Sequence, residues 1–133
     1  MDTLGEFVKL LLLAFEKANL AFPMQNQALW HALFYRLKHS AAPHKPVCLE
    51  DLLFDWDGIK PRAPKLAKLL SGLIAGDAVQ TRNPLFDEWR MNPGLAELWE
   101  RSHATLGRGE QQFLDLAVAL AKNEFRKATP RVA

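Results

Sequence analysis

The chemically most distinctive stretch of the chain is a basic lead-in to an apolar helical stripe. Residues 57–76 read DGIKPRAPKLAKLLSGLIAG, in which Lys60, Arg62, Lys65 and Lys68 stand beside two prolines. Such a cationic segment can dock against an anionic partner, and it can equally be the solvated face of an ordinary surface helix. The residue types alone leave both interpretations open.

The remaining reactive side chains do not assemble into a catalytic or metal-binding motif. His44 and Cys48 are spaced as one pair of metal ligands, but a zinc site needs three or more ligands and usually a second pair. We expect Cys48 to be a small buried apolar residue. Ser40, Ser71 and Ser102 lie outside any nucleophile motif. We therefore predict no catalytic residues, no metal and no cofactor, and a metal protein that uses the His44 pair is the least supported alternative.

Three polar aromatic residues recur at a spacing of four along one predicted helix. His31, Tyr35 and His39 would lie on one side of a helix over residues 24–39. They border an apolar stripe, and we expect their polar ends to reach solvent at its edge.

Length, charge and cysteine content place the chain among ordinary globular proteins. Its 133 residues suit one domain, and a net charge of +2 does not by itself demand a nucleic-acid partner. The single cysteine fits a reducing compartment. The most apolar run, Leu10 to Phe15, is much shorter than the roughly 20 residues of a membrane span. We expect a cytoplasmic protein that is not inserted in a membrane.

Apolar periodicity predicts a series of helices separated by prolines and glycines. The first begins at Asp2 or Thr3 and ends before Pro23. The others are expected over residues 24–39, over a short stretch within 48–58, and over 64–75, 93–105 and 110–127. Lys60 and Ala63 precede prolines and should be extended, and Pro64 should open the helix that Gly76 ends.

Residues 78–91 fit two structures. Val79 to Arg82 and Leu85 to Met91 can pair as a small hairpin around Asn83-Pro84. Asn-Pro is also a good helix start, with asparagine as the N-cap. We favour the hairpin.

The first helix carries an unusually wide apolar face. Leu10 and Leu13 broaden a stripe that already contains Val8, Leu11 and Phe15. A face of this width implies burial on more than one side, or a partner subunit. We predict a homodimer whose contacts come from the first helix and the two C-terminal helices.

Residues 24–91 give the order helix, proline loop, short helix, turn, amphipathic helix and hairpin. This order resembles the winged helix-turn-helix module of bacterial transcription regulators. The residues that carry the resemblance are Leu49, Leu52 and Leu53 in the short helix, Leu66, Leu69, Leu70 and Leu73 in the amphipathic helix, and the sequence AGDAV at 75–79. One departure is the turn over residues 57–63, which is longer and richer in proline than the usual turn of three or four residues.

The resemblance implies a fold and a set of contacts. The fold is mainly α: one compact domain over residues 1–133 with five to six helices and one small β-hairpin. Residues 24–91 form the winged-helix-like part, and residues 1–22 and 93–127 supply flanking helices. The implied nucleic-acid contacts are Lys60, Arg62, Lys65, Lys68 and Ser71 around the helix, and Arg82 near the tip of the wing.

The expected function is therefore that of a non-enzymatic regulator that binds double-stranded DNA. A helical protein–protein adaptor without DNA binding is the alternative. The near-neutral net charge and the acidic residues Glu50, Asp51, Asp55 and Asp57 favour the adaptor, because a DNA surface must turn these carboxylates away from phosphate.

Overall fold

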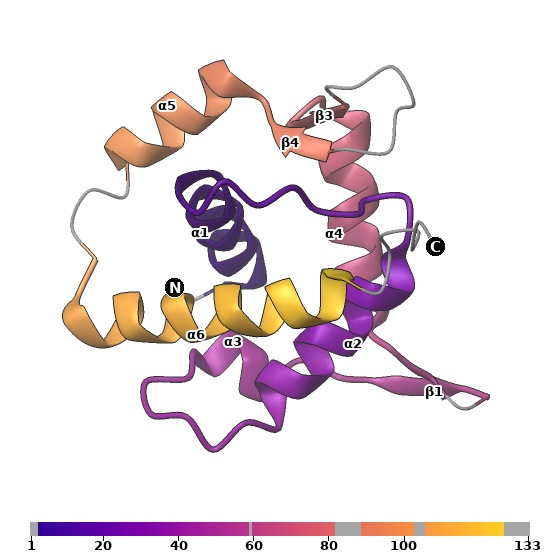
Figure 1. The fold of residues 1–133 in the computed structure, drawn as a ribbon. Helices are drawn as coiled ribbons and strands as arrows, with labels where there is room; N and C mark the ends of the chain where they lie inside the picture. The colour runs from indigo at the N-terminus through magenta and orange to yellow at the C-terminus, as the bar shows by residue number, and fades with distance from the viewer. Residues whose placement is uncertain (1–2, 59, 82–88, 103–105, 127–133) are drawn as a thin grey trace, which may run out of the picture.

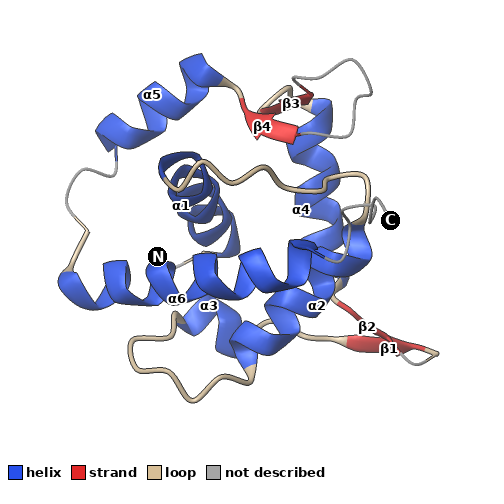
Figure 2. Cartoon of the chain, viewed as in Figure 1, coloured by secondary structure: helices blue, strands red, loops and turns tan. Residues whose placement is uncertain are grey.

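The computed structural model describes residues 3–58, 60–81, 89–102 and 106–126. Within these ranges the chain forms six helices and two antiparallel hairpins (Figures 1 and 2). The helices are α1 (Leu4–Lys17), α2 (Gln27–Lys38), α3 (Val47–Glu50), α4 (Pro64–Ala75), α5 (Pro93–Ser102) and α6 (Arg108–Phe125). The strands are β1 (Asp55–Asp57), β2 (Lys60–Arg62), β3 (Val79–Thr81) and β4 (Trp89–Met91). The predicted mainly helical class is confirmed, with a second hairpin that was not expected.

Helix α1 lies in the middle of the molecule. Thr3 caps it, since its Oγ1 accepts the backbone N–H of Glu6 at 3.1 Å. Its buried residues are Phe7, Val8, Leu10, Leu11, Leu12, Leu13 and Phe15. They are covered by α3, α5, α6 and β4 of the same chain (Figure 1). The width of the apolar face is thus explained by burial on several sides within one subunit, and it no longer argues for a homodimer.

Trp30 of α2 joins α2 to α1 and α6. Its ring centroid lies 6.0 Å from that of Phe15, 5.8 Å from Phe22 and 5.1 Å from Phe125. The indole N–H donates to the carbonyl of Pro23 at 3.3 Å, so the polar end of this fully buried side chain is satisfied.

The hairpin predicted over residues 78–91 is confirmed by the pairing of β3 with β4. Gln80 lies opposite Arg90, and the turn at Asn83-Pro84 falls outside the described residues. The backbone N–H of Phe22 donates to the carbonyl of Trp89 at 3.2 Å, which adds an isolated bridge to the outer side of β4. Trp89 is half-buried against the core. The hairpin is thereby fixed to the segment that joins α1 to α2.

The prediction of a short helix within residues 48–58 was wrong beyond its first turn. Helix α3 ends at Glu50, and the chain then enters β1, which leaves Leu53 74% exposed. The segment is extended because alternate side chains pack on the same side. The rings of Phe54 and Trp56 both lie against Tyr35, at 5.3 and 5.4 Å. Gly58, with φ of 70°, starts the turn into β2.

The boundaries of α4 are those expected from its prolines and glycine. Ala63 is extended, with φ of −106° and ψ of 107°, and Pro64 is the first helical residue. Gly76 is the C-cap with φ of −86°, and the left-handed residue is Asp77, with φ of 61°. The N–H of Ala78 donates to the carbonyl of Leu73 at 2.9 Å, which completes a Schellman motif.

No helix in the described ranges combines the length and apolar character needed to cross a bilayer.

Candidate nucleic-acid interface

The structure places the predicted contact residues on two adjoining elements. Lys60 and Arg62 lie on β2, and Lys65, Lys68 and Ser71 lie on α4; all five are exposed. Arg82, the predicted wing contact, falls outside the described residues. Helix α4 stands between the two hairpins, since β1–β2 leads into its N-terminus and β3–β4 follows its C-terminus (Figure 1).

Helix α4 buries a narrower face than its sequence predicts. Leu66 and Leu70 are fully buried, whereas Leu69 and Leu73 are only partly covered. The partly covered leucines lie beside the basic residues because positions three and four apart share a helix face. A shallow depression of about 380 Å³ results, lined by Lys65, Lys68, Leu69, Gly72 and Leu73. The exposed surface of α4 is therefore both basic and apolar.

Within the described part of the chain, no ion pair involves the four basic residues of this site, which are Lys60, Arg62, Lys65 and Lys68. The ion pairs found there are Lys17–Glu100, Arg36–Glu124, Lys45–Glu50 and Arg101–Glu97. From residue 58 to residue 76 the sequence contains no acidic residue. The first turn of α4 adds to the positive character, because the positive end of the helix dipole lies there and Ala63 gives no side-chain cap.

The acidic cluster is divided between two locations. Glu50 pairs with Lys45 at 2.8 Å, and the hydrogen bond from Lys45 holds the pKa of Glu50 below its usual value. In the hairpin, Asp55 lies directly opposite Arg62 in register, and Asp57 lies opposite Lys60. Residues directly opposite in an antiparallel pair share one face of the ribbon. The carboxylate of Asp55 therefore weakens the positive field around Arg62, and Lys65 and Lys68 of α4 are left as the strongest part of the basic surface.

A buried histidine fixes the junction between β2 and α4. His31 is 4% exposed, and its Nδ1 accepts the backbone N–H of Ala63 at 2.9 Å. Burial lowers the pKa of His31, and the nearby positive charge of Arg62 lowers it further. The expectation that His31 reaches solvent at the edge of the stripe was wrong. No local sequence signal links it to a partner 32 residues away.

Sequence inspection also missed an aromatic cluster beside the hairpin. Tyr35 is its centre, with the rings of His39, Phe54 and Trp56 at 4.4, 5.3 and 5.4 Å. The alternation in FDWD, residues 54–57, was the available signal, because it puts Phe54 and Trp56 on one side of a strand. The cluster holds the hairpin against α2.

The His44 and Cys48 pair does not form part of a larger ligand set. Cys48 is buried, and burial raises the pKa of its thiol. His44 is exposed and has φ of 65°, and its ring lies against Gly109 of α6. Among the described residues no three histidine, cysteine or acidic side chains are grouped as metal ligands.

Comparison of the chain with protein families, curated proteins and solved structures gave no significant match.

Proposed function

We propose that this is a cytoplasmic, non-enzymatic regulator that binds double-stranded DNA through a winged-helix-like arrangement. In this proposal α4 is the recognition helix and the β3–β4 hairpin is the wing. The observation that carries the proposal is the exposed cationic group formed by Lys60, Arg62, Lys65 and Lys68, which no described carboxylate pairs.

The helix that supports the recognition helix differs from the one expected. Helix α3 is a single turn and is separated from α4 by the β1–β2 hairpin. Helix α2 packs against α4 instead, and the bond from Ala63 to His31 sets where α4 begins. We therefore assign the supporting role to α2, with residues 39–63 as an extension between the two helices.

The chemistry of the site favours contact with the DNA backbone over base readout. Lys65 and Lys68 are point charges on flexible stems, which suit phosphate oxygens without selecting a base. The positive end of the α4 dipole adds a second feature that favours phosphate. Ser71 already accepts a hydrogen bond from Gln27 at 3.5 Å, which keeps its hydroxyl at the edge of the exposed face. We expect binding with a steep salt dependence and modest sequence preference.

The test is a titration of the protein into labelled duplex DNA over a series of salt concentrations. Each phosphate contact contributes about −0.9 to the slope of log affinity against log salt. The Lys65→Gln/Lys68→Gln variant should bind more weakly and reduce the steepness of that slope by about 2.

The matched control is Arg108→Gln/Lys122→Gln, which removes the same charge from exposed positions of α6. This control should retain the wild-type slope. Wild-type protein that leaves duplex DNA unbound at low salt contradicts the proposal, and so do two double variants that lose affinity equally.

A protein–protein adaptor is the second candidate, favoured by the mainly apolar depression on α4. Leu69, Gly72 and Leu73 give that depression a surface suited to an apolar side chain of a partner. The adaptor is the better supported of the two functions if duplex DNA does not bind at low salt. Lys65 and Lys68 would then only flank an apolar contact.

A further inference from the structure

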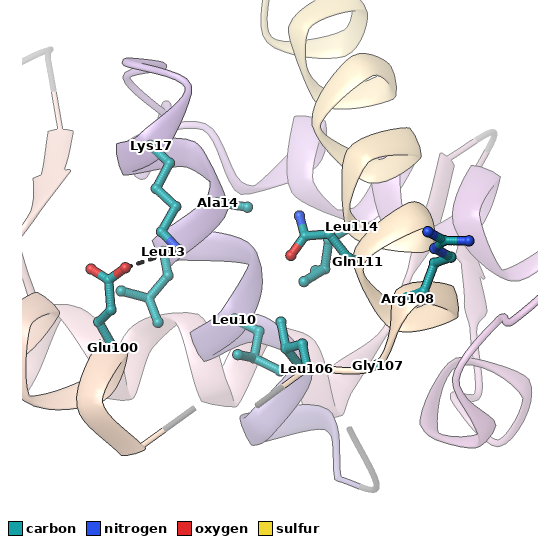
Figure 3. A pocket seen from close by; sticks show the side chains of 10 residues that line it. All are labelled: Leu10, Leu13, Ala14, Lys17, Glu100, Leu106, Gly107, Arg108, Gln111 and Leu114. Carbon is teal, nitrogen blue, oxygen red and sulfur yellow. Dashed lines mark ion pairs between the residues drawn. The ribbon is translucent and has the colours of Figure 1, made fainter. Parts of the chain in front are cut away.

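A second concave site lies on a different part of the molecule, between α1 and α6. It has a volume of about 340 Å³, and α5 borders it through Glu100 (Figure 3). This volume falls within the range of pockets that hold small organic molecules. None of the residues that line it belongs to the basic surface of α4.

The floor of this α1–α6 pocket is aliphatic. Leu10 and Leu13 of α1 and Leu114 of α6 line it and are 3%, 7% and 2% exposed, and Leu106 lies partly covered beside them. In Figure 3 Leu10 lies next to Leu106, Leu13 lies on the side of Glu100, and Leu114 lies beside Gln111. An aliphatic chain placed on them would leave water for an apolar surface, which is favourable.

The rim of the pocket is polar and carries charges of both signs. Among the described residues Lys17, Arg108 and Glu100 line it. Lys17 Nζ lies 2.9 Å from Glu100 Oε1, and both side chains are more than half exposed. An exposed ion pair of this kind contributes only about 0–1 kcal/mol, so a ligand carboxylate can compete with Glu100 for Lys17. The N-terminus of α6, an 18-residue helix, lies at this rim through Gly107 and Arg108, and the carboxylate of Glu110 already accepts the N–H of Gly107 there at 3.2 Å.

We infer that the α1–α6 pocket binds a small monocarboxylate with an aliphatic chain. The chain lies on the leucine floor, and the carboxylate binds Lys17 at the rim. This site is separate from the proposed DNA-binding surface, and the inference does not depend on the proposed function.

The test uses octanoate as the probe, below its micelle concentration, with 1-octanol and octylammonium as controls of matched chain length. Octanoate should give saturable shifts of the methyl resonances of Leu10, Leu13 and Leu114 and should raise the unfolding temperature. 1-Octanol should bind about tenfold more weakly, because it lacks the charge-assisted hydrogen bond to Lys17. Octylammonium should bind more weakly than 1-octanol.

Two variants show whether the pocket and its cation are responsible. Lys17→Met should weaken octanoate binding about tenfold and leave 1-octanol binding unchanged. The control Arg101→Met breaks an exposed ion pair of the same kind, Arg101–Glu97 at 2.9 Å, outside the pocket lining and should bind octanoate like the wild type. Ala14→Met should block the pocket from the α1 side and abolish octanoate binding, with the fold checked by circular dichroism.

The inference is overturned if the folded wild-type protein shows no saturable octanoate binding. It is also overturned if 1-octanol binds as tightly as octanoate, or if Lys17→Met has no more effect than Arg101→Met.

Discussion

His31 Nδ1 accepts the backbone N–H of Ala63 at 2.9 Å, and this bond attaches α2 to the residue between the end of β2 and the start of α4. A ring nitrogen can accept only while it carries no proton, so the contact requires a neutral imidazole. Burial and the charge of Arg62 both lower the pKa of His31 and thus favour that form. The orientation of α4 therefore depends on an imidazole whose pKa is held below its ordinary value.

We predict that the protein loses stability as the pH falls below about 6.5, the ordinary pKa of histidine. The pKa of His31 is lower in the folded state, so the unfolded chain takes up the proton first. The contribution of His31 is complete above the unfolded pKa and is lost as the pH falls toward the folded one. The slope from this one residue cannot exceed about 1.4 kcal/mol per pH unit. Urea unfolding over a series of pH values measures it.

His31→Gln is the control for this prediction. Its side-chain oxygen can accept the N–H of Ala63 but does not titrate. The variant should lack the part of the pH dependence that belongs to His31. An unchanged pH profile in His31→Gln would show that His31 is not the group responsible.

Gly109 lies in the first turn of α6, and a side-chain carbon there would overlap the ring of His44. Glycine to alanine within a helix normally adds about 0.5–1 kcal/mol of stability. Gly109→Ala should instead destabilise the protein by roughly 1–3 kcal/mol, because the ring and its loop must move. Thermal or urea unfolding gives the difference.

Two further variants separate the steric effect from helix propensity. Gly72 of α4 has open space where a side-chain carbon would stand, so Gly72→Ala should stabilise by about 0.5–1 kcal/mol. Adding His44→Gly to Gly109→Ala removes the ring and relieves a residue with φ of 65°, and should recover most of the loss. If Gly109→Ala stabilises the protein as Gly72→Ala does, the predicted overlap with the ring of His44 is wrong.

Asp77 ends α4 in the left-handed region, with φ of 61°, whereas the neighbouring Gly76 has φ of −86°. Asp77→Gly should stabilise the protein by roughly 0.5–1 kcal/mol, because glycine reaches this conformation without a steric cost. Asp77→Ala should destabilise it, since alanine adopts this left-handed φ less readily than aspartate. Both variants lose the exposed hydrogen bond that Asp77 accepts from Gln80 at 3.1 Å, so the difference between them comes from the backbone conformation. Equal unfolding midpoints for the two variants would contradict this account.

The helices could be predicted from sequence because their signals are local. Pro64 fixes the start of α4, and the spacing of Trp30, Leu33, Phe34 and Leu37 gives α2. The β3–β4 hairpin was favoured correctly for the same kind of reason. In residues 48–58 two local signals competed, since Leu49, Leu52 and Trp56 repeat like a helix while Phe54 and Trp56 alternate like a strand. The contacts of the Phe54 and Trp56 rings with Tyr35 stabilise the strand over the helix.

What could not be predicted depends on contacts between distant segments. The width of the α1 face fitted either a partner subunit or enclosure by the chain itself, and only the packing of α3, α5, α6 and β4 around α1 distinguishes them. The exposure of Lys60, Arg62, Lys65 and Lys68 followed from helix and proline rules. The placement of Asp55 opposite Arg62 did not, because it requires the register of a hairpin that the helical spacing concealed.

That cross-strand placement leads to a prediction about DNA binding. Asp55 lies opposite Arg62 and is exposed, so its carboxylate repels phosphate at the edge of the proposed interface. Asp55→Asn should therefore tighten duplex binding by about two- to fivefold, the effect expected of one exposed charge. The number of phosphate contacts does not change, so the salt slope should stay close to that of the wild type. Asp115→Asn on α6 makes the same change in net charge away from α4 and should leave the affinity unaltered. If both variants tighten binding equally, net charge and not the β1–β2 hairpin governs the interaction.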